Sequence, residues 1–385
     1  MFQLITWFPP FRSSLCVLRK STRKFILRQC FTMKNDSWKE TPCKQSDIQL
    51  KLSLLGGQSF RWKYSEDTGE FTGVFAGRVW KLKHVDDTLF YQTFSDVSTK
   101  CIPKKKAKKG SKLIQIPSQE SLKVEAEEDI LREYLRLDVD LHSLYEEWSA
   151  RDPHFAEAAK TFYGVRILKQ DPIENIFSFI CATNNHITRI SSMVEKMCSN
   201  FGEPIAEVDG TVYYSFPHPS NMVGEGAEKW MRDNGFGYRA KYIRGSAEIV
   251  TSSENGQDTW LENLLSLKYE DAKAELTKLS GIGAKVADCI CLMSLGHLGA
   301  VPVDTHVHQI AIRRYTPHLA KYKTVTHAVY DEIGGFFRNL YGDLAGWAHT
   351  ILFCADLKMF KDMTDSSKVK KLDTIGNKRK KLKSC

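Results

Sequence analysis

The fold is decided by one short stretch, Leu279-Ser280-Gly281-Ile282-Gly283-Ala284-Lys285-Val286-Ala287-Asp288. Helical patterns flank it at residues 269–279 and 284–295, so the two glycines predict a tight turn between two helices. Backbone N–H groups at the start of the second helix favour an anion, because that end of the helix dipole is positive. The stretch therefore predicts a helix–hairpin–helix motif at about 269–295 whose turn, at Gly281 and Gly283, holds a phosphate.

A lysine just past the turn adds chemistry to the motif. Lys285 lies in the first turn of the second helix, where the helix terminus and partial burial favour a neutral, nucleophilic amine. Asp304 follows in Val301-Pro302-Val303-Asp304-Thr305-His306 and precedes a helical pattern at 304–315. We expect it to cap that helix and to stabilise a cationic, sugar-like transition state. Lys285 and Asp304 are the predicted catalytic pair; an ordinary turn with a capping aspartate is the alternative interpretation.

Three further residues follow this pair at short spacing in the sequence. Cys289 and Met293 recur on the Lys285 face of the helix, where packing in the core is the simplest interpretation. His306 is expected either to contact a phosphate or to lie in the core.

The composition bounds the kind of protein. The chain has 385 residues, 42% of them hydrophobic, which is enough for a sizeable core and two subdomains. The chain has 55 Lys and Arg against 46 Asp and Glu, and this net charge of +9 fits a polyanionic partner. The cysteines are scattered without a Cys-x-x-Cys pair, so we expect no metal cluster. Scattered cysteines of this kind are typical of a protein in a reducing compartment. No apolar run approaches the ~20 residues of a membrane span.

The pattern along the chain changes from strand-like to helical. Alternation at residues 48–52, 60–62, 71–75, 79–82 and 89–94 predicts an antiparallel sheet, and helical spacing dominates from residue 129 onward. We predict an α+β fold, with an N-terminal antiparallel β-sheet subdomain packed on an all-helical body. Its expected parts are a basic leader (1–45), the β-rich subdomain (46–135), the helical domain (136–358) and a basic tail (359–385).

Three basic segments bear on targeting. The first 34 residues are rich in Arg and Lys and contain no acid, which is typical of a mitochondrial transit segment, and Met33 offers a second start that would omit it. The tail ends in Lys378-Arg379-Lys380-Lys381, which is typical of a nuclear signal or a DNA-binding arm. Residues 100–112 predict a solvated lysine-rich loop. We expect a nuclear protein with a mitochondrial form from the first start codon; plain disorder of these segments is the alternative.

Several motifs, in order from about residue 46 to 357, resemble one known family. They are Gly57-Gln58-Ser59-Phe60-Arg61-Trp62, Phe177-Ser178-Phe179-Ile180-Cys181, Asn184-Asn185, Gly237-Tyr238-Arg239-Ala240, the stretch from Lys285 to Met293, and Ala345-Gly346-Trp347-Ala348. Together they resemble the eukaryotic 8-oxoguanine DNA glycosylase/AP lyase family, within the helix–hairpin–helix DNA glycosylase superfamily. The two ends of the chain and the lysine-rich loop fall outside the resemblance.

The resemblance implies a mechanism and a set of binding residues. An oxidised guanine is flipped out of duplex DNA, Lys285 attacks C1′ of its deoxyribose, and β-elimination cuts the strand. The carbonyl of Gly57 accepts the N7–H that distinguishes 8-oxoguanine from guanine. The implied base-binding residues are Gly57, Cys289, Met293, Pro302, His349 and Phe353. The implied DNA-binding residues are Asn184, Arg189, Tyr238, Arg239, Gly281, Gly283 and His306.

The chain departs from the family pattern at two positions. His349 stands where the family usually has a glutamine that reads the Watson–Crick edge of the lesion, and an imidazole cannot reproduce the paired donor and acceptor of a carboxamide. His186 stands where a third asparagine normally follows Asn184-Asn185. We expect altered reading of the base at His349 and altered contacts to the opposite base near His186.

The partner implied is double-stranded DNA containing oxidised guanine paired with cytosine, bound by a monomer without cofactor, metal cluster or membrane. A relative that removes an oxidised pyrimidine or an alkylated purine is the enzymatic alternative. The lack of a four-cysteine cluster disfavours the iron–sulfur branch, while Gly57 and Phe353 disfavour the alkyl-purine branch. A catalytically silent DNA-binding module is the other alternative, which the pairing of Lys285 with Asp304 opposes.

Overall fold

A computed structural model describes residues 37–95, 126–252 and 256–357. The expected lysine-rich loop, the tail and most of the leader lie outside the described residues. Among the residues that are described, no helix is long and apolar enough to cross a bilayer.

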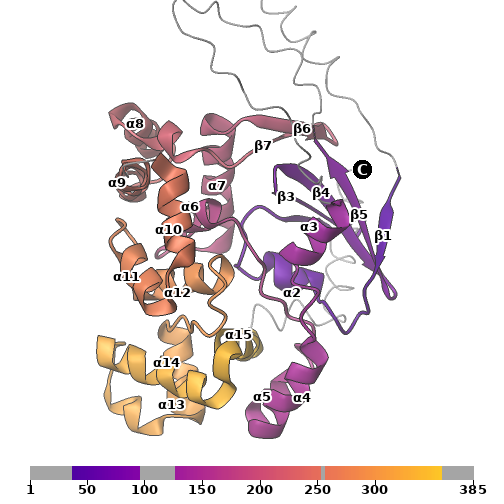
Figure 1. Cartoon of the computed structure of the whole chain (residues 1–385), viewed down its shortest axis with the longest axis vertical. Helices are drawn as coiled ribbons and strands as arrows, with labels where there is room; N and C mark the ends of the chain where they lie inside the picture. The colour runs from indigo at the N-terminus through magenta and orange to yellow at the C-terminus, as the bar shows by residue number, and fades with distance from the viewer. Residues whose placement is uncertain (1–36, 96–125, 253–255, 358–385) are drawn as a thin grey trace, which may run out of the picture.

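The first part of the chain forms a five-stranded antiparallel sheet with the order β1-β5-β4-β3-β2. Its strands are β1 (Lys39–Pro42), β2 (Lys63–Ser65), β3 (Glu70–Phe75), β4 (Arg78–Val85) and β5 (Thr88–Phe94). Ala76 and Gly77 both have positive φ, as a two-residue type I′ turn requires, so β3 and β4 form a tight hairpin. The predicted antiparallel sheet is confirmed (Figure 1).

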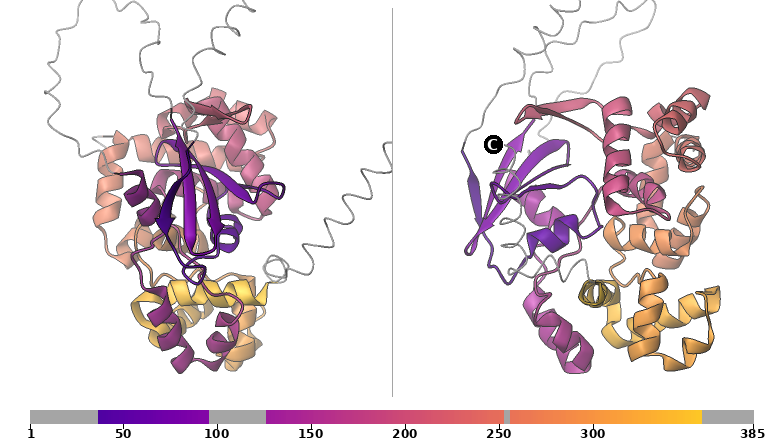
Figure 2. Two further views of the ribbon diagram at one scale, coloured as in Figure 1. Left: turned by 90° about the vertical axis from the view of Figure 1, so that its right-hand side faces the viewer. Right: turned by 180° about the vertical axis from the view of Figure 1, so that it is seen from behind.

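Helices make up most of the remaining described chain. Their bounds are α2 (Leu50–Leu55), α3 (Glu127–Tyr134), α4 (Leu141–Arg151), α5 (Pro153–Ala159), α6 (Pro172–Ala182), α7 (Ile187–Phe201), α8 (Glu225–Asp233), α9 (Arg239–Thr251), α10 (Gly256–Ser266), α11 (Tyr269–Thr277), α12 (Ala284–Met293), α13 (Thr305–Arg314), α14 (His327–Tyr341) and α15 (Ala345–Asp356), with 3-10 turns at Pro219–Met222, Pro317–Lys321 and Gly342–Leu344. The sheet lies on one side of the molecule and the helices α6 to α12 on the other (Figure 2). The α+β prediction is confirmed.

Several element predictions are wrong. Residues 48–52 were expected to form a strand, but Leu50–Leu55 form the helix α2. Residues 60–62 lie in a loop that precedes β2. The sheet also begins earlier than the expected boundary at residue 46, since β1 pairs with β5. The expected all-helical body contains a hairpin of β6 (Pro204–Val208) and β7 (Thr211–Tyr214), whose apolar side chains pack on the sheet.

The sheet packs on α3 around aromatic side chains. The Trp62 indole donates a hydrogen bond of 2.9 Å to the Tyr134 hydroxyl on α3. Gly73 on β3 makes room for this ring, since a Cβ atom there would lie 2.4 Å from Trp62. Any side chain at position 73 would therefore displace the indole and open the sheet core.

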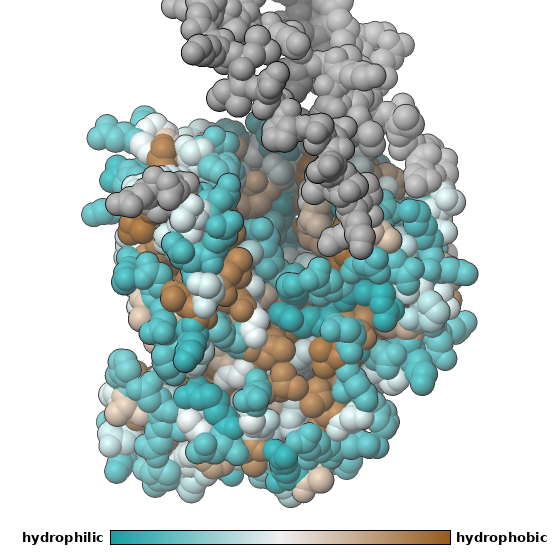
Figure 3. Space-filling view, in the orientation of Figure 1, coloured by the Kyte–Doolittle hydropathy of each residue, from teal (hydrophilic) through white to brown (hydrophobic). Residues whose placement is uncertain are grey.

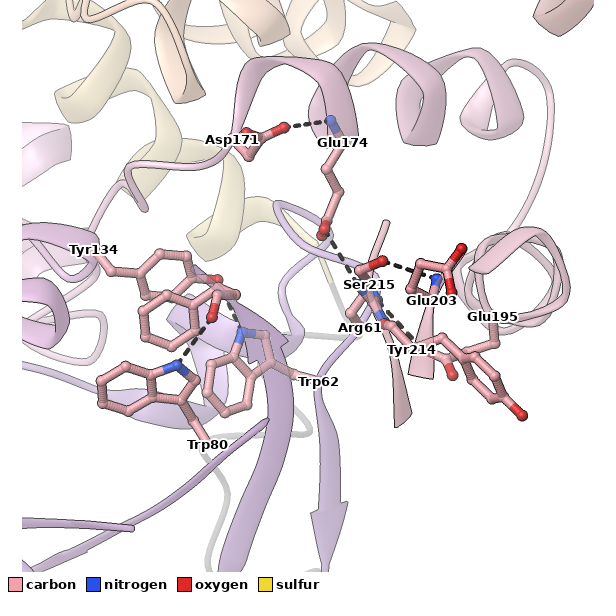
Figure 4. A network of polar contacts seen from close by, with 11 residues as sticks. Arg61, Trp62, Trp80, Tyr134, Asp171, Glu174, Glu195, Glu203, Tyr214 and Ser215 are labelled. Carbon is pink, nitrogen blue, oxygen red and sulfur yellow. Dashed lines mark hydrogen bonds and ion pairs between the residues drawn. The ribbon is translucent and has the colours of Figure 1, made fainter. Parts of the chain in front are cut away.

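The loop before β2 is fixed to the helical body by a buried arginine. Arg61 lies 3.4 Å from the Glu174 carboxylate on α6 and 3.5 Å from Glu195 on α7, and it donates to the backbone carbonyl of Tyr214 (Figure 4). Removing one partner of a buried pair leaves an uncompensated charge, which typically costs ~3–5 kcal/mol. Arg61 thus holds the Gly57-to-Trp62 loop against the helices that carry the site.

Candidate active site

The predicted helix–hairpin–helix motif consists of α11, the turn at residues 278–283, and α12. Gly281 has φ of +84° and lies directly against Tyr242 of α9, so a Cβ atom there would come within 2.7 Å of that ring. The Ser246 hydroxyl, also on α9, donates 3.1 Å to the Ser280 carbonyl. These contacts explain why the turn needs glycine and place it beside α9.

The start of α12 offers unpaired donors. Gly283 is its N-cap residue and supplies no side-chain cap, and the N–H groups of Gly281 and Gly283 have no acceptor within the described part of the chain. Gly283 is exposed. The turn therefore presents backbone N–H groups to solvent at the positive end of a helix dipole, as phosphate binding requires.

A cavity of about 280 Å³ lies along α12; we call it the base cavity. Lys285 and Asp304 both line it. The other predicted residues on its wall are Gly57, Cys289, Met293, Pro302, His349 and Phe353. All the side chains and the glycine that the resemblance implied for base binding thus converge on one cavity, from α12, the loop before α13, α15 and the loop after α2. Figure 3 shows apolar surface gathered near the middle of the molecule, between the sheet and the helical side.

Lys285 is half-buried and its pKa lies above the ordinary value. The Cys289 sulfur, to which it is hydrogen-bonded, is the main cause, and the Asp304 carboxylate adds to it, while burial opposes both. The expected lowering of this pKa is therefore wrong, because neighbouring groups outweigh burial and the helix terminus. Burial raises the pKa of the Cys289 thiol. In the DNA-free enzyme Lys285 is an ammonium that must lose a proton before it can act as a nucleophile.

The two carboxylate oxygens of Asp304 differ in their contacts. Its Oδ1 accepts hydrogen bonds of 2.9 Å from the N–H groups of His306 and Val307, as an N-cap residue does. Its Oδ2 accepts none from the described residues, and the residue lines the base cavity. The predicted cap is confirmed, and one carboxylate oxygen remains available for chemistry.

His349 is buried in the cavity wall without a hydrogen-bond partner. Neither ring nitrogen bonds to any described residue, and the ring lies 5.4 Å from Phe337 and 6.4 Å from Phe353 between centroids. Burial lowers its pKa to about 4, so the imidazole is neutral at physiological pH. The neutral imidazole of His349 carries one donor and one acceptor, and the residue lines the cavity.

The predicted opposite-base residues form a separate group at the α6–α7 and α8–α9 junctions. Asn184 lies in the α6–α7 loop with φ of +48°, and Tyr238 is 46% exposed at the end of the α8–α9 loop. The Tyr238 hydroxyl donates 3.3 Å to the Thr183 carbonyl, and the guanidinium of Arg239 lies 4.6 Å from the Tyr238 ring centroid. Arg189 donates 3.2 Å to the Gly235 carbonyl, which ties the two loops together.

Two of these predicted DNA contacts differ in accessibility. Arg239 is buried and donates to the carbonyls of Thr183 and Asn184, so it organises the α6–α7 loop in the absence of DNA. His306 is exposed on the first turn of α13, which excludes the core interpretation for its ring. His186 caps α7 by accepting from the Arg189 N–H at 3.4 Å.

Sequence reasoning missed several residues that hold the site. Asp288, completely buried on α12, accepts hydrogen bonds from Tyr269 and Tyr330 and pairs with Lys273 at 3.0 Å. We call these four residues the Asp288 cluster. Gln58 was quoted only as part of a motif, although it is buried and bonded to the chain at residues 166–170. No group of three metal-ligating side chains occurs within the described ranges.

The hairpin, the cavity with its lysine and aspartate, and the sheet packed on helices define the class of helix–hairpin–helix DNA glycosylases. The profile described as "8-oxoguanine DNA glycosylase, N-terminal domain" matches residues 40–176. The chain is 33% identical to the N-glycosylase/DNA lyase OGG1 of Arabidopsis thaliana, over 87% of this chain and 85% of that protein. It belongs to the eukaryotic 8-oxoguanine DNA glycosylase/AP lyase family, and so is a DNA N-glycosylase with lyase activity.

Solved structures agree with this assignment. The structure of MBOgg1 in complex with a low-affinity DNA ligand has a TM-score of 0.66 at 30% identity, and the match covers 86% of this chain and 98% of that one. The Clostridium acetobutylicum 8-oxoguanine glycosylase/lyase, solved with double-stranded DNA containing cytosine opposite 8-oxoguanine, has a TM-score of 0.64 at 26% identity, covering 84% and 97%. Both likenesses extend over the sheet and the helical body.

Proposed function

We propose that this enzyme removes 8-oxoguanine paired with cytosine from duplex DNA and then cuts the strand at the abasic site. The observation that carries the proposal is the convergence of Lys285, Asp304 and Gly57 on one base cavity. Its volume of about 280 Å³ is large enough to hold a single flipped base.

The chemistry begins with a proton transfer. Lys285 gives up its ammonium proton to solvent, and the neutral amine attacks C1′ as the bond to the base breaks; the base leaves with the electron pair and takes a proton from solvent. Asp304 supports this step, because its unengaged Oδ2 offers negative charge to the cationic sugar. Ring opening of the sugar then gives a Schiff base on Lys285. Loss of a proton from C2′ expels the 3′ phosphate and cuts the strand.

Recognition of the lesion rests on the loop after α2. The carbonyl of Gly57 would accept the N7–H that 8-oxoguanine has and guanine lacks. Leaving one such hydrogen bond unmade in a buried site costs about 1–3 kcal/mol. Cys289 and Phe353 line the same cavity and would contact the two faces of the base.

The opposite strand would be held outside the cavity. Tyr238 is exposed and stacked on Arg239, so it is placed to fill the gap that the flipped base leaves. Asn184, Arg189 and Arg239 would address the cytosine, while the unpaired N–H groups of the hairpin and the exposed His306 would contact phosphates.

A trapping experiment tests the proposal. A duplex with 8-oxoguanine opposite cytosine is incubated with the enzyme and borohydride, which should give a covalent adduct that Lys285→Gln lacks. A thymine-glycol duplex run in parallel should give little adduct; a reversed preference would favour an oxidised-pyrimidine enzyme. Adenine opposite the lesion should be processed more slowly than cytosine. No adduct from the wild type on either duplex would contradict the lysine mechanism.

Localisation is a separate part of the proposal. The basic first 34 residues and the basic tail support a nuclear enzyme with a mitochondrial form that starts at Met1. A reporter fused to residues 1–33 should enter mitochondria, and the same reporter fused to the tail should enter the nucleus. A reporter that stays in the cytosol with either segment would contradict the corresponding assignment.

A further inference from the structure

The lesion-reading loop is bonded to an extended segment at residues 165–170, which lies between the sheet subdomain and the helices. Gln58, the residue after Gly57, is buried in this contact. Its Nε2 donates 2.8 Å to the Arg166 carbonyl, and its Oε1 accepts 3.0 Å from the Leu168 N–H. The Gln58 side chain thus pairs with this segment much as a neighbouring strand would.

Gln170, at the end of the segment, bonds to two residues that line the base cavity, Gln58 and Met293. Its Nε2 donates 3.0 Å to the backbone carbonyl of Gln58, and its own N–H donates 2.9 Å to the carbonyl of Met293. Met293 is the last residue of α12, the helix that carries Lys285. One buried residue therefore joins the loop that carries Gly57 to the helix that carries the nucleophile.

The hydrogen bond from Gln170 to the Gln58 carbonyl affects the direction of the neighbouring Gly57 carbonyl. Gly57 has φ of +87°, a conformation open to glycine at little cost, so its peptide would rotate readily if the next residue were released. Gln58 is that next residue. Its backbone carbonyl accepts from the Gln170 carboxamide, and its side chain makes two hydrogen bonds to the segment at residues 165–170. The direction of the Gly57 carbonyl is consequently fixed by Gln58 and Gln170.

We infer that Gln170 is a positioning residue for lesion recognition, which acts through Gln58 to aim the Gly57 carbonyl at the flipped base. This inference rests on the proposed function. If the inference holds, a change at Gln170 should affect base excision and leave cleavage at an abasic site unaffected. Base excision needs the aimed carbonyl, whereas cleavage of a duplex that already contains an abasic site needs only Lys285 and DNA binding.

The test uses two substitutions of Gln170 in the full-length chain. Gln170→Met keeps the length of the side chain but cannot donate, so we expect single-turnover excision of 8-oxoguanine to fall roughly tenfold. Cleavage of a preformed abasic-site duplex should stay at the wild-type rate. Gln170→Glu should behave like Gln170→Met at pH 8 and regain excision, relative to wild type, as the pH falls. The reason is that a protonated carboxyl can again donate to the Gln58 carbonyl.

Gln49→Met is the matched control. Gln49 also donates through Nε2 to a backbone carbonyl, that of Thr161 at 3.1 Å, but it does not line the base cavity. Its substitution should change neither activity. Thermal unfolding of all three variants is measured alongside.

The outcomes are distinct. Loss of excision with abasic-site cleavage retained, and recovery of Gln170→Glu at low pH, support the inference. Parallel loss of both activities, or equal behaviour of the two variants at every pH, would show that Gln170 only supports the fold and overturn it. If Gln170→Met does not fold, Gln170→Glu compared between pH 8 and pH 6 carries the same test. Failure of the wild type to prefer 8-oxoguanine over guanine would instead overturn the proposed function.

Discussion

The helix α12 contributes to two pairings of lysine with aspartate, Lys273 with Asp288 and Lys285 with Asp304, and the two are built in opposite ways. In the Asp288 cluster the carboxylate is fully buried, and it is bonded to Lys273, Tyr269 and Tyr330 from α11 and α14. In the base cavity no ion pair within 4.0 Å joins Lys285 to Asp304 among the described residues, and one oxygen of Asp304 accepts no hydrogen bond.

The difference separates structure from chemistry. A carboxylate surrounded by three donors gains nothing from a substrate and holds its helices together. The Asp304 oxygen that accepts no hydrogen bond and the Lys285 amine belong instead to residues that line the cavity, where the reacting sugar would engage both. The unpaired nitrogens of His349 belong to the second kind of group.

The largest effect is expected at Lys285. Lys285→Gln should reduce both base excision and the borohydride adduct to background, because a carboxamide cannot form the Schiff base. Its unfolding temperature should stay close to that of the wild type. Lys273→Gln is the matched control on the same hairpin and should keep the adduct while unfolding at lower temperature. An adduct with Lys285→Gln would mean that another amine is the nucleophile.

Asp304→Asn should come next. Asparagine still caps α13 through its side-chain oxygen, but it lacks the charge that stabilises a cationic sugar. We expect the single-turnover rate of excision to fall by about 10²–10³ while thermal stability is retained. A rate close to the wild type would confine Asp304 to capping.

Asp288→Asn should show the reverse pattern. Breaking the buried pair with Lys273 should lower the free energy of unfolding by about 3 kcal/mol, measured by urea denaturation. The adduct yield for each folded molecule should be unchanged, because none of the cluster's donors reaches the cavity wall. A loss of adduct without a loss of stability would place Asp288 in the chemistry.

His349→Gln should have a smaller effect and the opposite sign. A carboxamide restores a side-by-side donor and acceptor, so excision of 8-oxoguanine should rise by roughly threefold to tenfold. Single-turnover rates on the cytosine-paired lesion measure it. An unchanged or lower rate would show that the imidazole reads the base as well as glutamine does.

The pH dependence of stability is the smallest effect. The pKa of His349 is lowered to about 4 by burial, so below its ordinary pKa of 6.5 the unfolded chain binds a proton that the folded chain excludes. Stability from this residue is therefore present at neutral pH and decreases as the pH falls from 6.5 toward 4. Between pH 7 and 5.5 the loss should be about 1 kcal/mol, and His349→Gln should remove it. Urea denaturation at both pH values compares the two proteins; equal losses would contradict this assignment.

The sequence was sufficient to predict the centre of the site and much of the helical body. The Gly281 turn, Lys285 and Asp304 could be recognised because local chemistry dictates them: positive φ, a helix start and a cap. The helix α7 (Ile187–Phe201) lies in the region where helical spacing was expected, and its apolar side chains recur on one face.

Other features depend on contacts distant in sequence. Residues 48–52 alternate like a strand but form α2, because Leu50 and Leu54 pack in the sheet core while Leu52 packs in the helical core. A helix buried between two cores lacks the one-sided pattern that identifies a surface helix. The raised pKa of Lys285 and the bonds of Gln170 likewise depend on partners that no local pattern reveals.

The position of α2 has a consequence for how the protein unfolds. Because its leucines belong to both cores, neither subdomain can lose its structure without exposing apolar side chains of the other. The matched profile crosses the same junction, since residues 40–176 begin within β1 and end within α6. The sheet and helices should therefore melt in one cooperative transition, and a fragment cut at their boundary would lose half of the support for the loop that begins at Gly56.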